Sequence, residues 1–377
     1  MKAILVHDHK FRKINGQFYS PGGFPDEVLQ RYTAIFDELI MIGRILKEDT
    51  VNPKYNLITL PNVTIQTRAN LEETISKVDV VISRLPSGNG IKAIKIAKRL
   101  KKPYLVEVVG CPFDSLWNYN WKGKIIAIPS MLQMKRAVKN APFAIYVTSE
   151  FLQKRYPCKG ETVNISNVNL VAASKEVLET RLNKIKTHHG PFVVGTAAAL
   201  DVPYKGQGFV IRALARLKKK GITNFKYQVA GGGDSSKLVE LAKELGVADQ
   251  LEIVGLLPRQ EVAPWLDGLD IYIQPSLQEG LPRSVIEAMG RGLPCIGAKT
   301  GGIPELLDKR FVYGKISERY MVRMIAEQLM IIIDNEVMSI QAARNFNLAN
   351  SEYDISVLTE RRKKIFNKLI ESIKEAN

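Results

Sequence analysis

Two glutamates stand out as residues that could bind a charged, hydroxylated substrate. Glu279 follows the apolar run that ends at Gln274, and Glu287 lies eight residues later, about two turns along a predicted helix. Pro282 suits the first turn of that helix, whose backbone N–H groups form an anion site suitable for a phosphate. One carboxylate could then accept hydrogen bonds from sugar hydroxyls while the other holds a ribose diol. The spacing alone leaves open that Glu279 merely favours the helix dipole and that Glu287 is solvated.

A lysine–glycine pair is a second candidate for phosphate binding. Lys205 and Gly206 stand where a loop ends and a helix is expected to begin. The ammonium could clamp a phosphate there, while the glycine allows close backbone approach. Two further glycine turns could face a nucleotide: residues 231–233 after a predicted strand, and Ser20–Gly23 before a predicted helix. Each feature has an ordinary alternative, a surface lysine or a flexible loop.

The motifs of several other chemistries are missing from the sequence. There is no Asp-x-Asp metal clamp, no GxxxxGK[ST] phosphate loop, no HExxH pattern and no G-x-S-x-G nucleophile elbow. Three widely spaced cysteines argue against a disulfide framework and a structural zinc site. His7 and His9 flank Asp8 where the first strand is expected to end, and they could bind a substrate or be structural. Lys, Arg and backbone N–H groups would have to stabilise any leaving diphosphate without a metal.

The charge is strongly basic and unevenly distributed. The 377 residues carry 54 Lys and Arg against 38 Asp and Glu, and residues 51–200 alone carry 22 against 9. Such a region attracts nucleic acid, anionic lipid or a phosphorylated substrate, although general solubility is the simpler explanation. No apolar run reaches the roughly 20 residues of a membrane span, and the short apolar N-terminus does not fit a signal peptide. We therefore expect a cytoplasmic protein, peripheral at most at the inner face of the cell membrane.

Two series of alternating strands and helices must position the candidate residues. Apolar runs of strand length alternate with segments of helical period through both halves of the chain, which predicts parallel sheets covered on both faces. We expect an α/β fold of two doubly wound Rossmann-like domains that face a cleft. The domains span residues 1–174 and 175–354, with a final helix over 355–377 that crosses back and with 175–190 as the linker. Ligands should bind in the loops at the carboxyl ends of the strands.

Two basic segments of the first half are candidates for membrane docking. The predicted helix over 90–102 mixes Ile and Leu with Lys and Arg, and Trp117, Tyr119 and Trp121 are interleaved with lysines. Both segments could dock on an anionic membrane. Alternatively, the helix covers a sheet and the aromatic side chains belong to the core.

The order and spacing of the shorter motifs make the second half resemble glycosyltransferase family 4. The motifs that carry the resemblance are Glu-x7-Glu at Glu279 and Glu287, Lys205-Gly206, the AGGG turn ending at Gly233, Val254-Gly255, Pro275-Ser276 and GGIPELL over 301–307. The resemblance implies a GT-B fold and a retaining glycosyltransferase that moves a hexosyl or N-acetylhexosaminyl group without a metal or other cofactor. In the first half, the segments YLVEVVGCPFD and YVTSEFLQKRYP resemble enzymes of bacterial capsule and exopolysaccharide assembly.

The resemblance also implies roles for residues at matching positions. Glu279 would contact the donor sugar, Glu287 the ribose and Lys205 the diphosphate. The other donor-side candidates are Gly22, Gly23, Gly206, Gly231, Gly232, Gly255, Leu257, Ser276, Gly280, Leu281, Pro282 and Arg283. Family members often carry an Arg where this chain has Ala199. They often carry a His after the strand over 104–108, where Asp114 is the nearest ionisable residue. Asp114 is therefore the candidate for activating the acceptor, and His7, His9 and Trp117 are further acceptor-side candidates.

The substrates implied by the resemblance are a nucleotide sugar and a sugar acceptor. A UDP-sugar is favoured over a GDP-sugar, and the acceptor is a saccharide or a lipid-diphosphate-linked saccharide of bacterial surface polysaccharide assembly. An anionic membrane surface is a further expected partner. Nucleic acid is not expected, because no recognised binding motif accompanies the charge. The alternatives left open are a sugar-nucleotide epimerase of the same fold, a basic nucleic-acid-binding protein and, because of Ala199, a catalytically silent scaffold.

Overall fold

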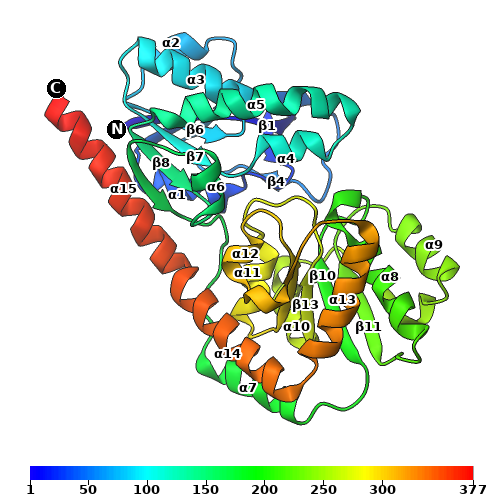
Figure 1. The fold of residues 1–377 in the computed structure, drawn as a ribbon. Coiled ribbons are helices and arrows are strands. Elements are labelled where there is room, and N and C mark those ends of the chain that lie inside the picture. Colours follow the sequence, from blue (N-terminus) through cyan, green and yellow to red (C-terminus); the bar gives the residue numbers. More distant parts are fainter. Residues whose placement is uncertain (377) are drawn as a thin grey trace. The chain divides into compact units, whose positions relative to one another are not determined.

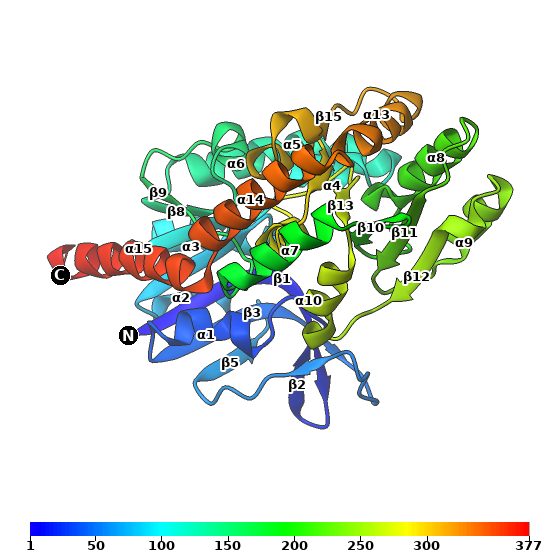
Figure 2. The ribbon, with the colours of Figure 1, turned by 90° about the horizontal axis from the view of Figure 1, so that it is seen from below.

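The computed structural model describes residues 1–376, which form two compact units (Figure 1). Met1–Ile165 and the chain from Thr359 onward make the first unit, and Ser166–Leu358 makes the second. The division after Ile165 lies earlier in the chain than the predicted boundary after residue 174. Most of the predicted linker over 175–190 is instead helix α7 (Lys175–Lys186), which packs on α14 (Asn335–Glu352) within the second unit (Figure 2). The segment is polar because α7 buries little more than Arg181 and Ile185.

The first unit is built on a nine-stranded mixed sheet. Its parallel strands lie in the order β5-β3-β1-β6-β7-β8-β9, and two short antiparallel strands extend the far end of β1. The strands are β1 Lys2–Ile14, β2 Gln17–Ser20, β3 Glu38–Lys47, β4 Asn56–Leu57, β5 Val63–Gln66, β6 Val80–Leu85, β7 Tyr104–Val108, β8 Phe143–Tyr146 and β9 Glu161–Asn164. The central strands β6 and β7 are buried along almost their whole length, which explains their continuous apolar sequences.

Helices cover this sheet. They are α1 Asp26–Thr33, α2 Leu71–Ser76, α3 Gly88–Arg99, α4 Pro112–Trp117, α5 Trp121–Lys139, α6 Phe151–Arg155 and the far part of α15 Ile355–Ala376. Phe366 of α15 makes edge contacts with the rings of Tyr32 and Phe36, so the last helix is anchored to the first unit. The apolar side chains of α3, including Ile94, are buried against the sheet. This agrees with the alternative in which the helix covers the sheet, since its apolar side chains are not exposed to a membrane.

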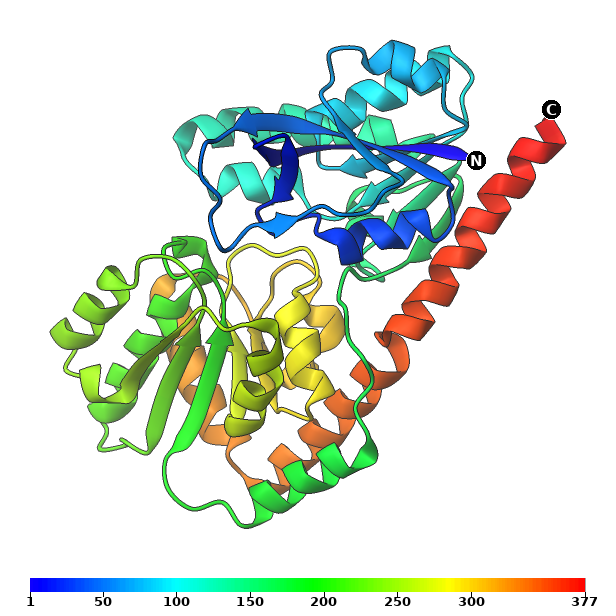
Figure 3. The ribbon, with the colours of Figure 1, turned by 180° about the vertical axis from the view of Figure 1, so that it is seen from behind.

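The first strand is longer than predicted. It continues past Val6 to Ile14 and turns back into β2, so that His7 and His9 lie within the strand and not in a loop after it. Figure 3 shows β1, in dark blue, running from the N-terminus into this hairpin. The pairing of β1 with β3 shifts register between Val6 and Lys10, so the two histidines sit at an irregularity of the ladder. Between β3 and β5, the two-residue strand β4 pairs with β2.

The second unit has a six-stranded, fully parallel sheet in the order β12-β11-β10-β13-β14-β15. The strands are β10 Phe192–Ala197, β11 Phe225–Ala230, β12 Leu251–Gly255, β13 Ile271–Gln274, β14 Cys295–Ala298 and β15 Val312–Tyr313. In both units the chain winds outward in one direction from the first strand and then returns to its other side. The predicted doubly wound α/β fold is confirmed, with topological switch points between β1 and β6 and between β10 and β13.

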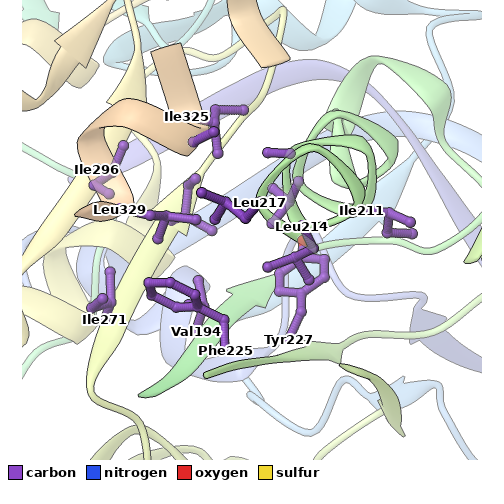
Figure 4. Packing of buried hydrophobic residues seen from close by; sticks show 14 of the residues in the cluster. Val194, Ile211, Leu214, Leu217, Phe225, Tyr227, Ile271, Ile296, Ile325 and Leu329 are labelled. Carbon is purple, nitrogen blue, oxygen red and sulfur yellow. The ribbon is translucent and has the colours of Figure 1, made fainter. Parts of the chain in front are cut away.

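A packed hydrophobic core fixes the second sheet. Its helices are α7, α8 Gln207–Lys218, α9 Ser236–Glu244, α10 Arg259–Gly268, α11 Arg283–Gly290, α12 Ile303–Leu306, α13 Glu318–Ile332 and α14. Figure 4 shows Leu214 and Leu217 of α8 and Leu329 of α13 reaching toward Val194 and Phe225 of the sheet. These side chains are almost completely buried. Such dense packing resists displacement, so the loops at the strand ends start from fixed positions.

The described residues contain neither a membrane-crossing helix nor a cluster of metal-ligating side chains. Within residues 1–376, none of the helices combines the length and the apolarity that a bilayer-crossing segment needs. In the same residues, no three or more His, Cys, Asp or Glu side chains gather in a way that could hold a metal ion.

Candidate active site

The loops after β10 and β13 meet at the switch point of the second sheet. The first loop leads through a short 3-10 turn, Pro203–Lys205, into α8, and the second leads through Glu279 into α11. Lys205 Nζ lies 2.8 Å from Glu279 Oε1, and the two side chains are 23% and 11% exposed. The topology thus brings together two predicted residues that are 74 positions apart in the sequence. In open α/β sheets, ligands bind at the loops that follow the two strands of a switch point, and this pair belongs to those loops.

A buried glutamine holds Glu279 in place. Gln274 Nε2 donates to Glu279 Oε1 at 3.1 Å and to Ser276 Oγ at 2.8 Å. Its Oε1 accepts from the Tyr272 hydroxyl at 3.0 Å and from Ser284 Oγ at 3.3 Å. Because both ends of the amide are used, its orientation is fixed. Our sequence reasoning missed Gln274, and the available signal was a polar residue at the end of the otherwise apolar strand IYIQ.

Two glycines let the loops approach closely. Gly206 has a φ of +80°, and a Cβ there would lie 2.2 Å from the carbonyl oxygen of Pro275. Gly301, from the GGIPELL motif, has a φ of +54°, and its Cβ would lie 2.2 Å from the carbonyl oxygen of Glu279. Any other residue would push the Glu279 segment away from its neighbours. The two motifs therefore fix the position of the acidic residue from opposite sides.

Backbone hydrogen bonds join the loops after β10, β11 and β12 into one continuous rim at the carboxyl ends of these strands. The Gly231 N–H donates to the Gly255 carbonyl at 2.7 Å, and the Leu200 N–H donates to the Gly232 carbonyl at 2.9 Å. The three predicted glycines thus lie on the edge of the sheet that also carries Lys205. Leu257, two residues beyond Gly255, continues this rim and is half-buried.

Helix α11 begins at the same edge. Gly280 and Leu281 lead to its N-cap, Pro282, which has no side-chain acceptor for the first N–H groups. Arg283 is exposed in the first turn, so a cation and the positive end of the helix dipole lie together. The predicted candidates from Gly280 to Arg283 are therefore brought to the rim.

Glu287 has different neighbours from Glu279. It lies one turn beyond Arg283, in a largely buried position on α11. Burial raises the pKa of its carboxyl group, and the positive charges of Arg283 and Arg259 oppose this rise. Arg259 begins α10, directly after the loop that contains Gly255 and Leu257. Glu287 therefore lies on the side of the β12–α10 loop, whereas Glu279 lies on the side of Lys205.

In the first unit, the predicted histidines are packed behind the glycine turn. His9 Nε2 lies 2.9 Å from Ser20 Oγ, and the His9 ring would lie 2.9 Å from a Cβ on Gly23. Burial lowers the pKa of both His7 and His9 to about 4, so both are neutral at neutral pH. Gly22 has a φ of +109° with open space around it. The histidines thus shape the turn that contains Gly22 and Gly23.

Asp114 is held in an ion pair. Arg155 Nη1 lies 3.1 and 3.0 Å from its two carboxylate oxygens, and the guanidinium also lies over the rings of Phe113 and Phe151. Trp117, another predicted acceptor-side residue, stacks on Phe113. The guanidinium engages both oxygens of this carboxylate, so either oxygen would have to give up a hydrogen bond before it could accept a proton from an acceptor hydroxyl. The geometry therefore does not favour Asp114 as the residue that activates the acceptor.

A buried polar network in the first unit was not predicted either. The Tyr32 hydroxyl donates to Glu107 Oε2 at 2.8 Å, and Arg84 Nη1 donates to the same oxygen at 3.1 Å. Glu107 is only 3% exposed. Arg84 and Glu107 interrupt the apolar strands VVISRL and YLVEV, and this is the signal that could have identified them.

Comparison with known proteins identifies the family of the second unit. The model of the family "Glycosyl transferases group 1" matches residues 179–349, which include Lys205, Glu279 and Glu287. Protein CapJ of Staphylococcus aureus is 32% identical over 97% of this chain and 95% of that protein. The amylovoran biosynthesis glycosyltransferase AmsK of Erwinia amylovora is 32% identical over 40% of this chain and 37% of its own length.

Solved structures agree on the fold. HepE of Anabaena in complex with UDP matches 98% of this chain and 100% of that chain, with a TM-score of 0.67 and 16% identity. HepE has also been solved with UDP-glucose. At this level of identity, the likeness shows the fold alone, which is GT-B. Together with the full-length similarity to CapJ, these findings confirm the resemblance seen in the motifs: the chain belongs to the glycosyl transferases group 1 family and is a glycosyltransferase of the GT-B fold.

Proposed function

We propose that this glycosyltransferase is retaining and metal-independent, and that it moves a hexosyl or N-acetylhexosaminyl group from a nucleotide sugar. The donor is a UDP-sugar in preference to a GDP-sugar. The acceptor is a saccharide or lipid-diphosphate-linked saccharide of bacterial surface polysaccharide assembly. The Lys205–Glu279 pair at the switch point carries this proposal. The full-length similarity to CapJ, the biosynthetic role in the name of AmsK and the nucleotides bound by HepE support it.

Lys205 and the start of α11 would stabilise the leaving group. When the bond from the anomeric carbon to the diphosphate breaks, negative charge accumulates on the departing oxygen. The Lys205 ammonium and the N–H groups of α11 lie on the same rim, and Arg283 adds a second cation to the first turn. Glu279 and the amide of Gln274 hold Lys205 in position before a substrate arrives. Little reorganisation is then needed as the charge develops.

The two glutamates would orient the donor. An ionised carboxylate is an acceptor only, so Glu279 can take hydrogen bonds from sugar hydroxyls and Glu287 from the ribose diol. Burial already disfavours the Glu287 anion, so hydrogen bonds from a ribose would relieve an existing cost. Gly231, Gly232 and the loop from Gly255 to Leu257 would surround the nucleoside. Asp114 has no part in this scheme, because Arg155 holds both of its oxygens.

The donor is tested with a thermal-shift panel of UDP-, GDP- and ADP-sugars, each with and without a chelator. We expect the UDP-sugar to raise the melting temperature most, and the chelator to leave that shift unchanged. Loss of the shift on chelation would contradict metal independence. Binding of nucleic acid that falls steeply with salt, with no response to any sugar nucleotide, would instead favour the basic-protein alternative.

The reaction is tested by product analysis. NMR of the product should show the donor's anomeric configuration in the new linkage, since the proposal requires retention. Conversion of the donor without an acceptor would favour the epimerase alternative.

The ribose role of Glu287 is tested by a shape-conserving change. Glu287→Gln should weaken UDP-sugar binding by roughly 10- to 100-fold, the scale of a hydrogen bond to a charged group. Glu244→Gln, at an exposed position on α9, is the matched control and should bind as the wild type does. Equal binding by both variants would remove Glu287 from the donor site.

A further inference from the structure

We propose that the outer face of α4 and α5 docks this protein on an anionic lipid bilayer. The α5 face is defined here by Trp121, Ile125, Ile128 and Leu132 of α5, together with Tyr119 in the turn before the helix. This inference goes beyond the transfer reaction, since binding to lipid can be measured with no sugar donor present.

Large apolar side chains form a continuous stripe on the solvent side of α5. Trp121, Ile125, Ile128 and Leu132 follow one another at intervals of four, three and four residues. These intervals place all four on one side of a helix. Their exposures are 68%, 65%, 52% and 43%. A stripe of this kind normally faces a protein core, but here it faces outward.

The opposite side of α5 already has its partners. Ala127, Met134 and Val138 are buried in the first unit, so the helix is attached through smaller or flexible side chains. Gly123 is part of this attachment, because a Cβ there would lie 2.1 Å from the carbonyl oxygen of Leu116 in α4. The start of α5 is thus packed tightly on α4. The exposed stripe is therefore presented on a fixed support.

The charge around the stripe identifies the partner as an anionic surface. Residues 120–140 contain five basic residues and no acidic residue. Lys122 lies over the ring of Trp121 at 5.7 Å, and Lys124 lies over the ring of Trp117 at 5.6 Å. Tryptophan rings favour the level of lipid headgroups, and lysines beside them attract anionic lipid. An apolar stripe bordered by cations is the pattern of a helix that lies in the plane of a membrane interface.

Exposed isoleucines elsewhere lack this combination. Ile331 on α13 is 57% exposed, but Glu327 precedes it by one turn and Asp334 follows by three residues. Acidic neighbours of this kind would repel an anionic bilayer. Ile331 therefore provides a matched control for the isoleucines of the α5 face.

The test is cosedimentation with vesicles of phosphatidylglycerol and phosphatidylcholine, compared with phosphatidylcholine alone, without sugar nucleotide. We expect the wild type to bind the anionic vesicles, with a blue shift of tryptophan fluorescence. The double variant Ile125→Ser/Ile128→Ser should lose at least about tenfold in partitioning, since two isoleucines no longer enter the interface. Lys122→Gln/Lys124→Gln should lose roughly 30-fold. Ile331→Ser should bind as the wild type does.

Several outcomes would overturn the proposal. They are equal binding to neutral and anionic vesicles, no binding, or wild-type binding by the lysine variant. A wild-type dimer that becomes monomeric in Ile125→Ser/Ile128→Ser would assign the stripe to a second copy of the chain. If the isoleucine variant does not fold, the lysine variant decides, because its substitutions change only exposed side chains. The thermal shift by UDP-sugar keeps the two proposals separate: an intact shift without vesicle binding overturns docking alone.

Discussion

The helix that starts at the switch point meets a different partner in each of the two sheets. In the first unit, the carboxylate of Asp8 accepts from the N–H of Gly88 at 2.6 Å and from that of Asn89 at 3.3 Å, where α3 begins. The chain therefore supplies its own anion to this helix. The acid stabilises the helix dipole and occupies the place that a phosphate would take.

In the second unit, the corresponding helix α11 begins after Pro282 without a side-chain cap. Lys205 and Glu279 lie at this switch point and are paired with each other at 2.8 Å, and Arg283 adds a cation in the first turn of α11. The Glu279 carboxylate is paired with Lys205, and the N-cap residue of α11, Pro282, has no side-chain acceptor for the first N–H groups. A substrate anion can meet both the lysine and the helix there.

The difference shows that topology alone does not make a binding site. The parallel strands of both sheets wind outward in both directions from a switch point, and in both a helix follows the strand on its far side. In the first sheet, the Asp8 carboxylate and the neutral side chains of His7 and His9 lie at the switch point. In the second sheet, the Lys205 ammonium lies at the corresponding place. This difference supports the proposal that the diphosphate binds at the second unit.

The largest effect is expected from removing the cation. Lys205→Ala should lower the transfer rate by about 10²–10³-fold, equivalent to about 2.7–4 kcal/mol, because the leaving diphosphate loses a preorganised positive group. Steady-state kinetics at saturating donor measures this loss. Lys237→Ala, at an exposed position on α9, is the control and should retain full activity. A wild-type transfer rate in Lys205→Ala would contradict the proposal that the second switch point stabilises the leaving diphosphate.

Close packing at the second switch point gives the next effect. Gly206 and Gly221 have nearly the same left-handed φ, +80° and +77°, but only a Cβ at Gly206 would meet another atom within 4 Å. Gly221→Ala should therefore cost about 1–2 kcal/mol of unfolding free energy from its φ alone. Gly206→Ala should cost about 1–3 kcal/mol more, because of its contact with Pro275. Urea unfolding of both variants measures the difference. Equal losses of unfolding free energy would show that the loop after β13 moves to accommodate the added Cβ.

Acid should affect the two switch points in opposite directions. The pKa of His7 is lowered from 6.5 to about 4, so the unfolded chain binds the proton first and stability falls as the pH drops through that window. Burial raises the pKa of Glu287, so the folded state binds the proton first and acid favours it. We expect the first unit to lose about 2 kcal/mol between pH 7 and pH 5 through His7.

Hydrogen exchange resolves the two responses. Peptides from β1 should lose protection on acidification, after correction for intrinsic rates, whereas peptides from α11 should not. His7→Asn should remove about half of the loss in β1, because burial lowers the pKa of His9 in the same strand to about 4 as well. A loss of the same size in both elements would mean that the histidines do not distinguish the units.

The sequence was sufficient for the parts of the fold that depend on local pattern. Apolar strands and the helices between them follow from periodicity, and parallel strands place their carboxyl ends on one edge. This is why Lys205 and Glu279 could be predicted to meet. Gln274 was missed because its role depends on four partners that converge only in three dimensions.

Other differences come from contacts between distant segments. The extension of β1 is polar, and it is a strand only because β2 and β3 pair with it. The Asp114 ion pair joins residues 41 positions apart, so no local pattern reveals it. The α5 helix is apolar on two sides, and periodicity cannot tell which side the fold will bury. Tertiary packing decides each of these outcomes.

The smallest effect tests the first switch point directly. Asp8→Ala removes the acceptor for the N–H groups of Gly88 and Asn89, so it should cost about 1 kcal/mol of unfolding free energy. The remaining cap, Ser87 Oγ with the N–H of Gly90 at 3.0 Å, keeps the helix from unravelling. Because we expect the Asp8 carboxylate to act only on the stability of α3, the shift in melting temperature caused by UDP-sugar should equal that of the wild type. Asp8→Asn keeps an acceptor oxygen and should fall between the two in stability. If Asp8→Ala folds but UDP-sugar no longer raises its melting temperature, the first switch point takes part in donor binding. The assignment of donor binding to the second sheet alone would then be wrong.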